Sequence, residues 1–418
     1  MSARLIVAVL ACTFCAFQAV AGSADADGFF VEVYTEGLNQ PIALAWAPDG
    51  RLFVAEREGA IRIIDDGVLL DEPFVETGAF SEGECGALGL ALSPDFANDR
   101  FVYAFVTTSE KEQRILRWTD NQNVGENETI IRGNLPSSGT VHNGGCLRFA
   151  PDGLLYFSVG DIGTPENSQD IQSLAGKLSR INPDGSVPAD NPFETPTGAK
   201  RATFASGFRN PFRFCFSPDG RLFVMDVGSS GDNQREEINL VRSGLNYGWP
   251  EVEGTSETAA ADGFTNPLLA YHDQGSSISG CVFYSDSLYP EEYEGNLFHI
   301  DYVSKAIFRA VLTGDEIVSH EYFIGLDNGP VDLALGNDGN LYYSELFSGR
   351  IMRIRTTNPQ EDRPTADLDL EPDESSGASN SIRGMCGVGM VHTMITAMMM
   401  MAAIAHRRRL ATKPRRQS

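Results

Sequence analysis

Basic residues, histidines and cysteines are all scarce in this chain of 418 residues. Lys and Arg total 32 against 57 Asp and Glu, which leaves a formal net charge of −25. A surface of that sign repels phosphate backbones, so the composition argues against nucleic acid as a partner. The length suits one large β-domain or two or three smaller domains, and the six histidines offer few candidates for a catalytic base.

Two of the seven cysteines, Cys12 and Cys15, belong to an N-terminal segment that we expect to be removed. There Arg4 precedes an apolar run over residues 5–20, which ends in the small residues of a cleavage site. This pattern predicts a secretory signal peptide over residues 1–21. The protein is therefore expected to be exported, whether to the periplasm, the cell surface or the medium.

The cysteines of the body are fewer still, and export makes disulfides permissible among them. Four cysteines allow three pairings, between which the sequence does not choose. Packed apolar thiols are the default interpretation, while a disulfide or a soft metal ligand stays open. The four are Cys85, Cys146, Cys215 and Cys281.

The C-terminal end has two parts. Residues 358–383 are rich in Pro, Asp, Glu, Ser and Thr, which predicts a disordered linker. Within residues 384–418, an apolar run over 385–405 is long enough to span a bilayer, and His406 and three arginines follow it. We expect either a hydrophobic membrane anchor or a sorting tail that is clipped from a surface protein, with a basic end in both cases.

Strong helical periodicity is also lacking between residues 28 and 357, where one short pattern recurs instead. An alternating apolar strand leads into a Pro-Asp-Gly turn or a near relative, a second apolar strand follows, and then a third. Period-two alternation with Asp-Gly turns predicts antiparallel hairpins, and 42 glycines suit the many turns. The six copies start near Ile42, Leu88, Cys146, Phe212, Cys281 and Val331.

Six small antiparallel sheets at this repeat length predict an all-β fold, a six-bladed β-propeller over residues 28–357. We expect residues 28–34 to supply the outer strand that closes the ring against the last blade. Three longer inserts, at 109–138, 163–201 and 229–277, are expected to form loops between strands. In a propeller, such loops crowd one mouth of the channel and build the binding site.

The stretch 141–161 carries the strongest catalytic candidate. His142 is followed by two glycines within three residues, and a hairpin then returns the chain to Asp161. A base and a carboxylate would therefore meet at one end of a sheet. A surface histidine at a strand start is the alternative interpretation.

Ordered motifs run through residues 30–355. They are Gly86-Ala-Leu-Gly-Leu-Ala-Leu-Ser-Pro-Asp-Phe, His142-Asn-Gly-Gly, Val159-Gly-Asp, Gly176-Lys-Leu-Ser-Arg-Ile-Asn-Pro-Asp-Gly, Gly207-Phe-Arg-Asn-Pro, Glu236-Glu-Ile-Asn, Asn246-Tyr-Gly-Trp-Pro and Ser279-Gly-Cys-Val-Phe-Tyr. In this order, on a six-fold repeat, the chain resembles the glucose/sorbosone dehydrogenases. The resemblance implies a calcium-containing six-bladed propeller that uses pyrroloquinoline quinone to oxidise sugars.

The resemblance also implies roles for individual residues. His142 matches the general base that takes the proton of the sugar's anomeric hydroxyl, and Asp161 matches the carboxylate that orients it. Arg209 and Asn210 match residues at the cofactor's quinone edge, where an arginine stabilises developing negative charge. Lys305 lies close to the position of a further cofactor-binding lysine.

The same resemblance places a calcium near Glu237 and Tyr247, since calcium prefers carboxylate and carbonyl oxygens. Glu84 stands about where the family has a substrate-contacting glutamine, and Asn143 follows the base, so both are candidate substrate-binding residues. In each case a structural role is the alternative. Examples are a salt-bridged blade edge for Arg209, a solvated turn for Glu237 and a core aromatic for Tyr247.

Several positions depart from the family pattern. The cationic positions of blades five and six fall near Val303 and at Val331 and Ala334, which are apolar, while Glu84 adds an acid. Lost cations and added repulsion both weaken the binding of a cofactor that carries three carboxylates.

The sequence therefore predicts an exported sugar dehydrogenase that depends on pyrroloquinoline quinone and calcium, with a sugar or sugar-like alcohol as its small-molecule substrate and His142 as the base. Two alternatives stay open. One is a non-catalytic, surface-displayed propeller that binds carbohydrate or protein. The other is a calcium-dependent lactonase, by analogy of fold.

Overall fold

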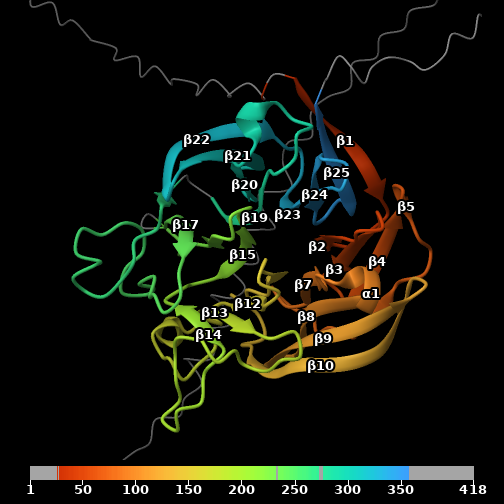
Figure 1. Cartoon of the computed structure of the whole chain (residues 1–418). Coiled ribbons are helices and arrows are strands. Elements are labelled where there is room, and N and C mark those ends of the chain that lie inside the picture. The colour runs from red at the N-terminus through yellow and green to blue at the C-terminus, as the bar shows by residue number, and fades with distance from the viewer. Residues whose placement is uncertain (1–25, 27, 232–233, 273–275, 357–418) are drawn as a thin grey trace, which may run out of the picture. The chain divides into compact units, whose positions relative to one another are not determined.

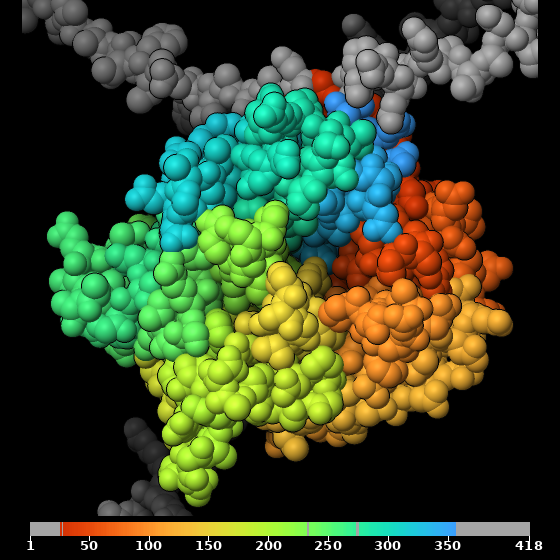
Figure 2. Space-filling model, in the orientation of Figure 1, coloured from red at the N-terminus to blue at the C-terminus, as the bar shows by residue number. Residues whose placement is uncertain are grey.

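The computed structural model describes residues 26, 28–231, 234–272 and 276–356, and these form six antiparallel sheets. Each sheet is one blade, and the blades follow one another around a shared centre in chain order (Figures 1 and 2). The prediction of an all-β, six-bladed propeller is confirmed. The predicted signal peptide, linker and C-terminal tail lie outside the described residues.

In each blade the strand order along the chain runs from the inner strand outward. Blade 6 also contains β1, which comes from the start of the chain and lies at the outer edge of that blade. Blade 1 contains β2 (Pro41–Trp46), β3 (Leu52–Glu56), β4 (Ala60–Asp65), β5 (Val68–Leu69) and β6 (Val75–Glu76). Blade 2 contains β7 (Ala87–Leu92), β8 (Phe101–Ser109), β9 (Glu112–Asn121) and β10 (Val124–Pro136). Blade 3 contains β11 (Leu147–Phe149), β12 (Leu155–Val159), β13 (Lys177–Ile181) and β14 (Thr203–Ser206).

The second half of the ring repeats this order. Blade 4 contains β15 (Pro211–Phe216), β16 (Leu222–Asp226), β17 (Glu236–Val241) and β18 (Leu269–Tyr271). Blade 5 contains β19 (Ile278–Phe283), β20 (Leu297–Asp301), β21 (Ala306–Thr313) and β22 (Glu316–Gly325). Blade 6 contains β23 (Pro330–Leu335), β24 (Leu341–Glu345), β25 (Arg350–Thr356) and β1 (Phe29–Glu36). The helical turns described are α1 (Phe96–Asp99), η1 (Pro165–Ser168) and η2 (Glu291–Tyr293).

The ring closes by pairing the first strand with the last. β1 runs antiparallel to β25, with Phe29 opposite Thr356 and Glu36 opposite Arg350 (Figure 1). The expectation that the N-terminal segment closes the last blade is therefore confirmed. The Pro-Asp-Gly turns join inner to second strands as predicted, and in the first of them Gly50 has φ +97°, a conformation that favours glycine.

The insert predicted at 109–138 is wrong as a loop. Most of it forms the long hairpin β9–β10, whose turn places Gln122 and Asn123 in the left-handed region. The strand β10 lies at the outer edge of blade 2 and is mostly exposed, so its residues lack the apolar alternation that marks a strand. Residues 182–202 and 242–268 do connect strands, within the other two inserts.

Apolar side chains fill the space between blades, and the four body cysteines are among them. Cys85, Cys146, Cys215 and Cys281 are free and buried. The default interpretation of packed thiols is confirmed. No helix within the described ranges is long and apolar enough to cross a membrane.

Candidate active site at one mouth of the channel

Three loops from blades 3 and 4 meet at the mouth where the inner strands begin. His142 precedes β11, Asp161 follows β12, and Arg209 with Asn210 precedes β15. The structure brings the side chains of His142, Asp161 and Arg209 into direct contact. All three were predicted as site residues from the sequence. Only the proximity of the first two was expected from local structure, because a single hairpin joins them.

The Asp161 carboxylate orients the imidazole. Its Oδ1 lies 2.7 Å from Nδ1 of His142 and accepts the backbone N–H of Gly163 at 2.8 Å. Its Oδ2 accepts Nε1–H of Trp249 at 3.0 Å. Burial acts to raise the pKa of Asp161, but the hydrogen bonds from His142, Gly163 and Trp249 hold that pKa below its ordinary value.

The guanidinium of Arg209 determines the tautomer of the imidazole. A terminal nitrogen of Arg209 lies 2.9 Å from Nε2 of His142, and the other donates to the carbonyl of Val227 at 3.0 Å. A guanidinium only donates hydrogen bonds, so Nε2 is the acceptor in this contact. The ring proton therefore sits on Nδ1 and is donated to Asp161, while the lone pair of Nε2 accepts the N–H of Arg209.

The backbone at His142 is held in an unusual conformation. Its φ is +52°, and its N–H donates to Oε2 of Glu84 at 2.6 Å. Such a conformation is rare for residues with a side chain, and it persists where neighbouring contacts hold it. Glu84, a predicted substrate-binding residue, thus lies at the mouth and supports the loop that presents the base.

The amides of the two neighbouring asparagines hold loops rather than face the mouth. The side-chain oxygen of Asn210 accepts the N–H of Gly144 at 3.1 Å, which ties the blade 4 loop to the His142 loop. Asn143 is only 1% exposed, and its amide contacts Ser137 and Cys85. Its burial argues against the predicted direct contact of Asn143 with a substrate.

Asp226, which the sequence analysis missed, positions Arg209. It is the last residue of β16, and its two oxygens accept the backbone N–H groups of Arg209 and Asn210 at 2.9 and 2.7 Å. Burial and the nearby Glu237 carboxylate raise the pKa of Asp226 well above its ordinary value. The sequence does carry a signal for it, because the second strands of four blades end in an acid: Glu56, Asp226, Asp301 and Glu345.

Of the predicted calcium residues, Glu237 lies next to Arg209, in the lining of the same cavity. Glu237 accepts the N–H of Gly254 at 2.6 Å and the amide of Asn239 at 3.0 Å, and burial raises its pKa to about 7. Together with Arg209 and Trp249 it lines a cavity of about 10 Å³, room for roughly one water molecule or ion. Asp226 and Glu253 line the same cavity.

Other observations bear on that cavity. The side-chain oxygen of Asn239 is buried without a partner. The ring of Tyr247 stacks on Phe208 with centroids 4.9 Å apart, and its hydroxyl donates to Leu240, so only its backbone carbonyl is left for a cation. Across the described ranges, no three His, Cys, Asp or Glu side chains converge as a metal-ligand group.

The remaining cofactor position, Lys305, lies in the turn between β20 and β21 and donates to the carbonyl of Asp327 at 3.1 Å. This turn follows Asp301 and is at the same end of the propeller as His142. Val303 in the same turn is 43% exposed, whereas Val331 is buried and Ala334 half-buried in β23. The apolar residues at the family's cationic positions are thus partly core residues here.

Comparison with known proteins identifies the family and the fold of this chain. The glucose/sorbosone dehydrogenase family matches residues 38–353. An aldose sugar dehydrogenase of Escherichia coli is 29% identical over 353 residues, covering 78% of this chain and 93% of that protein. The PQQ-bound structure of an aldose sugar dehydrogenase from Streptomyces coelicolor superposes with a TM-score of 0.69 at 29% identity, covering 79% of this chain and 99% of the other. Human Hedgehog-interacting protein is 26% identical over a shorter stretch of 227 residues, covering 44% of this chain and 31% of that protein.

Proposed function

Because this chain belongs to the glucose/sorbosone dehydrogenase family, we propose that it oxidises an aldose or sugar-like alcohol with pyrroloquinoline quinone and calcium. Membership supports an oxidoreductase acting on sugars. One observation carries the finer proposal: His142 presents an unprotonated Nε2 at the mouth while Asp161 holds Nδ1–H.

The residues of the site divide the work of alcohol oxidation. Nε2 of His142 accepts the hydroxyl proton of the substrate, and Asp161 stabilises the imidazolium that results. Before that step, the N–H of Arg209 must leave Nε2, so that the substrate hydroxyl takes its place. The freed guanidinium is then available to an anionic neighbour at the same mouth.

The residues present fit the quinone end of the cofactor. Bound pyrroloquinoline quinone would supply the acceptor for the hydride, which carries both electrons of the oxidation. Arg209 would hold its quinone edge, Asn210 would support the adjoining loop, and Lys305 offers a second cation at the same end of the channel. Two cations face three carboxylates, so we expect weaker cofactor binding than in relatives that carry more cations there.

Calcium would occupy the cavity beside Glu237, which Tyr247, the other predicted calcium residue, does not line. The support is the crowding of carboxylates around a cavity of ionic size, together with the orphaned oxygen of Asn239. A divalent cation would favour the ionised form of Glu237, whose pKa burial otherwise raises to about 7.

A non-catalytic propeller that binds carbohydrate or protein is the second candidate. Apolar Val303, Val331 and Ala334 at cationic positions favour it, and so does the similarity to Hedgehog-interacting protein. The two candidates differ in whether the purified protein takes up the cofactor.

One experiment separates them. The purified protein is mixed with calcium and micromolar quinone, and the bound-quinone absorbance and sugar-dependent dye reduction are measured. We expect both in the wild type, loss of turnover with retained cofactor in His142→Ala, and unchanged turnover in His320→Ala, a control histidine in β22. No absorbance change in the wild type would overturn the cofactor proposal and favour the binding module.

We also propose export, on the basis of residues 1–21. Mass spectrometry of the protein from the producing cells would show the mature N-terminus near residue 22 and whether residues 384–418 are retained. An intact N-terminus on cytoplasmic protein would contradict export.

A further inference from the structure

The second mouth of the channel, opposite His142, opens into a cavity of about 440 Å³. The inner strands begin at the His142 mouth and end at this one: β11 starts five residues after His142 and ends at Phe149, which lines the cavity. The volume falls within the roughly 300–1,000 Å³ of typical small-ligand sites. Nothing in the proposed oxidation uses this cavity.

The walls of the far-mouth cavity expose polar and apolar atoms in similar measure. They come from the ends of β2, β7 and β11 and the turns that follow. Trp46 and Phe149 supply aromatic surface, and the indole Nε1 of Trp46 is shielded from solvent without a hydrogen-bond partner. The aliphatic part comes from Leu44, Leu90, Leu92, Pro48 and Pro94.

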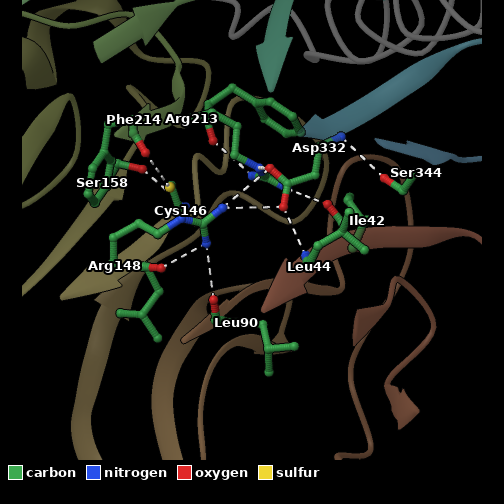
Figure 3. A network of polar contacts seen from close by, with 12 residues as sticks. Ile42, Leu44, Leu90, Cys146, Arg148, Ser158, Arg213, Phe214, Asp332 and Ser344 are labelled. Atoms are coloured by element: carbon green, nitrogen blue, oxygen red, sulfur yellow. Dashed lines mark hydrogen bonds and ion pairs between the residues drawn. The ribbon is translucent and has the colours of Figure 1, made fainter. Parts of the chain in front are cut away.

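A cation lines this cavity and belongs to a charged triad at the centre of the ring. Figure 3 shows the guanidiniums of Arg148 and Arg213 directed at the carboxylate of Asp332. Arg148 approaches Asp332 at 3.3 Å, and Arg213 approaches it at 3.1 Å. Arg148 lines the cavity and is 22% exposed in its side chain, whereas the other two side chains are at most 1% exposed.

The triad carries a net charge of +1, because two guanidiniums share one carboxylate. Backbone carbonyls of Leu90 and Leu147 accept further N–H groups of Arg148, but they supply no counter-charge (Figure 3). The turns that follow β2, β7, β11 and β23 carry carboxylates, and none of them lines the cavity: Asp49, Asp95, Asp152 and Asp338. Asp49 pairs with Arg51, and Asp95 accepts from Asn98.

A partly buried cation that shares its one carboxylate with a second cation is stabilised when an anion accompanies it. A charge of +1 matches a monoanion, and aromatic and aliphatic walls match an apolar body.

We propose that the far-mouth cavity binds a small organic monocarboxylate with an apolar body. The carboxylate would meet Arg148, and the body would pack against Trp46 and Phe149. This site is independent of the oxidation proposed at the His142 mouth.

Benzoate is the probe, with benzyl alcohol as its uncharged counterpart, titrated into the full-length protein by calorimetry and by tryptophan fluorescence. Trp46 is one of three tryptophans, so its environment contributes to the fluorescence signal. We expect saturable binding of benzoate at least tenfold tighter than that of benzyl alcohol. Equal affinities, or no saturable binding of benzoate, would overturn the proposal.

Variants assign the binding to this cavity. Arg148→Met should weaken benzoate at least tenfold, whereas Arg148→Lys, which keeps the charge, should retain most of the affinity. If Arg148→Met does not fold, Ala45→Met fills the cavity from β2 without touching the triad and should weaken benzoate by a similar factor. His142→Ala should bind benzoate as the wild type does. Loss of binding in His142→Ala, with no effect of Ala45→Met, would place benzoate at the other mouth and overturn the assignment.

Discussion

In blades 3 and 4 a buried carboxylate lies at or just after the end of the second strand. The two carboxylates bind different groups. In blade 4, Asp226 closes β16 and accepts two backbone N–H groups of the loop before its own inner strand. In blade 3, β12 ends at Val159, and the carboxylate comes two residues later as Asp161, which accepts from the side chains of His142 and Trp249. A shift of two residues thus turns a backbone support into an orienting group for a base.

The blade 4 arrangement is the commoner one in this ring. Glu56 of blade 1 accepts the N–H of Asn39 at 2.7 Å, and Asp301 of blade 5 accepts that of Ser277 at 3.1 Å. Blade 3 lacks this support and is tied instead to blade 4, since the N–H of Asp161 donates to the carbonyl of Arg209 at 2.7 Å. The site is therefore one specialised blade held by an ordinary neighbour.

The largest expected effect separates the two carboxylates by activity. Asp161→Asn should lower the rate of sugar-dependent dye reduction by roughly 10²–10⁴-fold, because an amide does not stabilise the imidazolium and permits the wrong tautomer. The urea midpoint should change little by comparison. A variant with near wild-type turnover would show that Asp161 is a structural residue like Asp226.

Asp226→Ala should have the opposite profile. It leaves two N–H groups without acceptors, and we expect a loss of about 2–6 kcal/mol in the free energy of unfolding, at about 1–3 kcal/mol for each donor. Asp226→Asn, which keeps one acceptor, should lose less. If Asp226→Ala instead abolished turnover at unchanged stability, the distinction between the two carboxylates would fail.

The fold was predictable from sequence because its information is local. Pro-Asp-Gly turns mark the hairpins of blades 1, 3 and 4, near relatives mark those of blades 2 and 6, and the recurring strand pattern gives the count of six. The pairing of His142 with Asp161 was also local, since one hairpin separates them. The role of Trp249 was not predictable, because it depends on a contact between loops of different blades, in which Trp249 reaches back 88 positions to Asp161. Asp226 acts within its own blade, and the acid that recurs at the end of the second strand was the signal for it.

Strand β10 was missed for a different reason. Its residues are mostly exposed at the edge of blade 2, so burial does not impose an apolar pattern on them. The apolar residues at the family's cationic positions also show that burial is not visible in the sequence. An alignment identifies Val331 as a departure, but only the packed ring shows it to be a buried core residue.

Blade 5 supplies the matching contrast for histidine. His299 in β20 is fully buried, its Nε2 lies 2.8 Å from Nε2 of His320, and its Nδ1 has no hydrogen-bond partner. Burial, followed by the proximity of His320, lowers the pKa of His299 to about 3. Its other ring neighbours are Phe308 and Tyr271. In place of the carboxylate that contacts the ring of His142, the ring of His299 therefore has aromatic neighbours.

This depressed pKa has a defined consequence for stability. Unfolded His299 titrates near 6.5, so its contribution to the stability of the native state is fully present above pH 6.5 and is lost as the pH falls toward 3. The free energy of unfolding, measured by urea titration, should fall less between pH 7 and pH 4 in His299→Phe than in the wild type, by an amount on the order of 2 kcal/mol. The phenyl ring can keep the stacking on Phe308. Parallel curves for variant and wild type would contradict the assignment.

The smallest expected effect tests how tightly blade 4 holds the blade 3 carboxylate. Trp249→Phe removes the N–H donated to Oδ2 of Asp161 and leaves the bonds from His142 and Gly163 in place. One hydrogen bond to a charged group contributes about 1.5–3 kcal/mol, so a rate loss of roughly tenfold or somewhat more is expected. The pKa of Asp161 should rise, which moves the acid limb of the pH–rate profile to higher pH.

Trp118→Phe is the matched control, because Trp118 is buried in β9 of blade 2, away from the mouth. It should lower stability without moving the acid limb. If Trp249→Phe also lost only stability, with an unshifted acid limb, the indole would be a packing residue and the Asp161 carboxylate would be held by blade 3 alone.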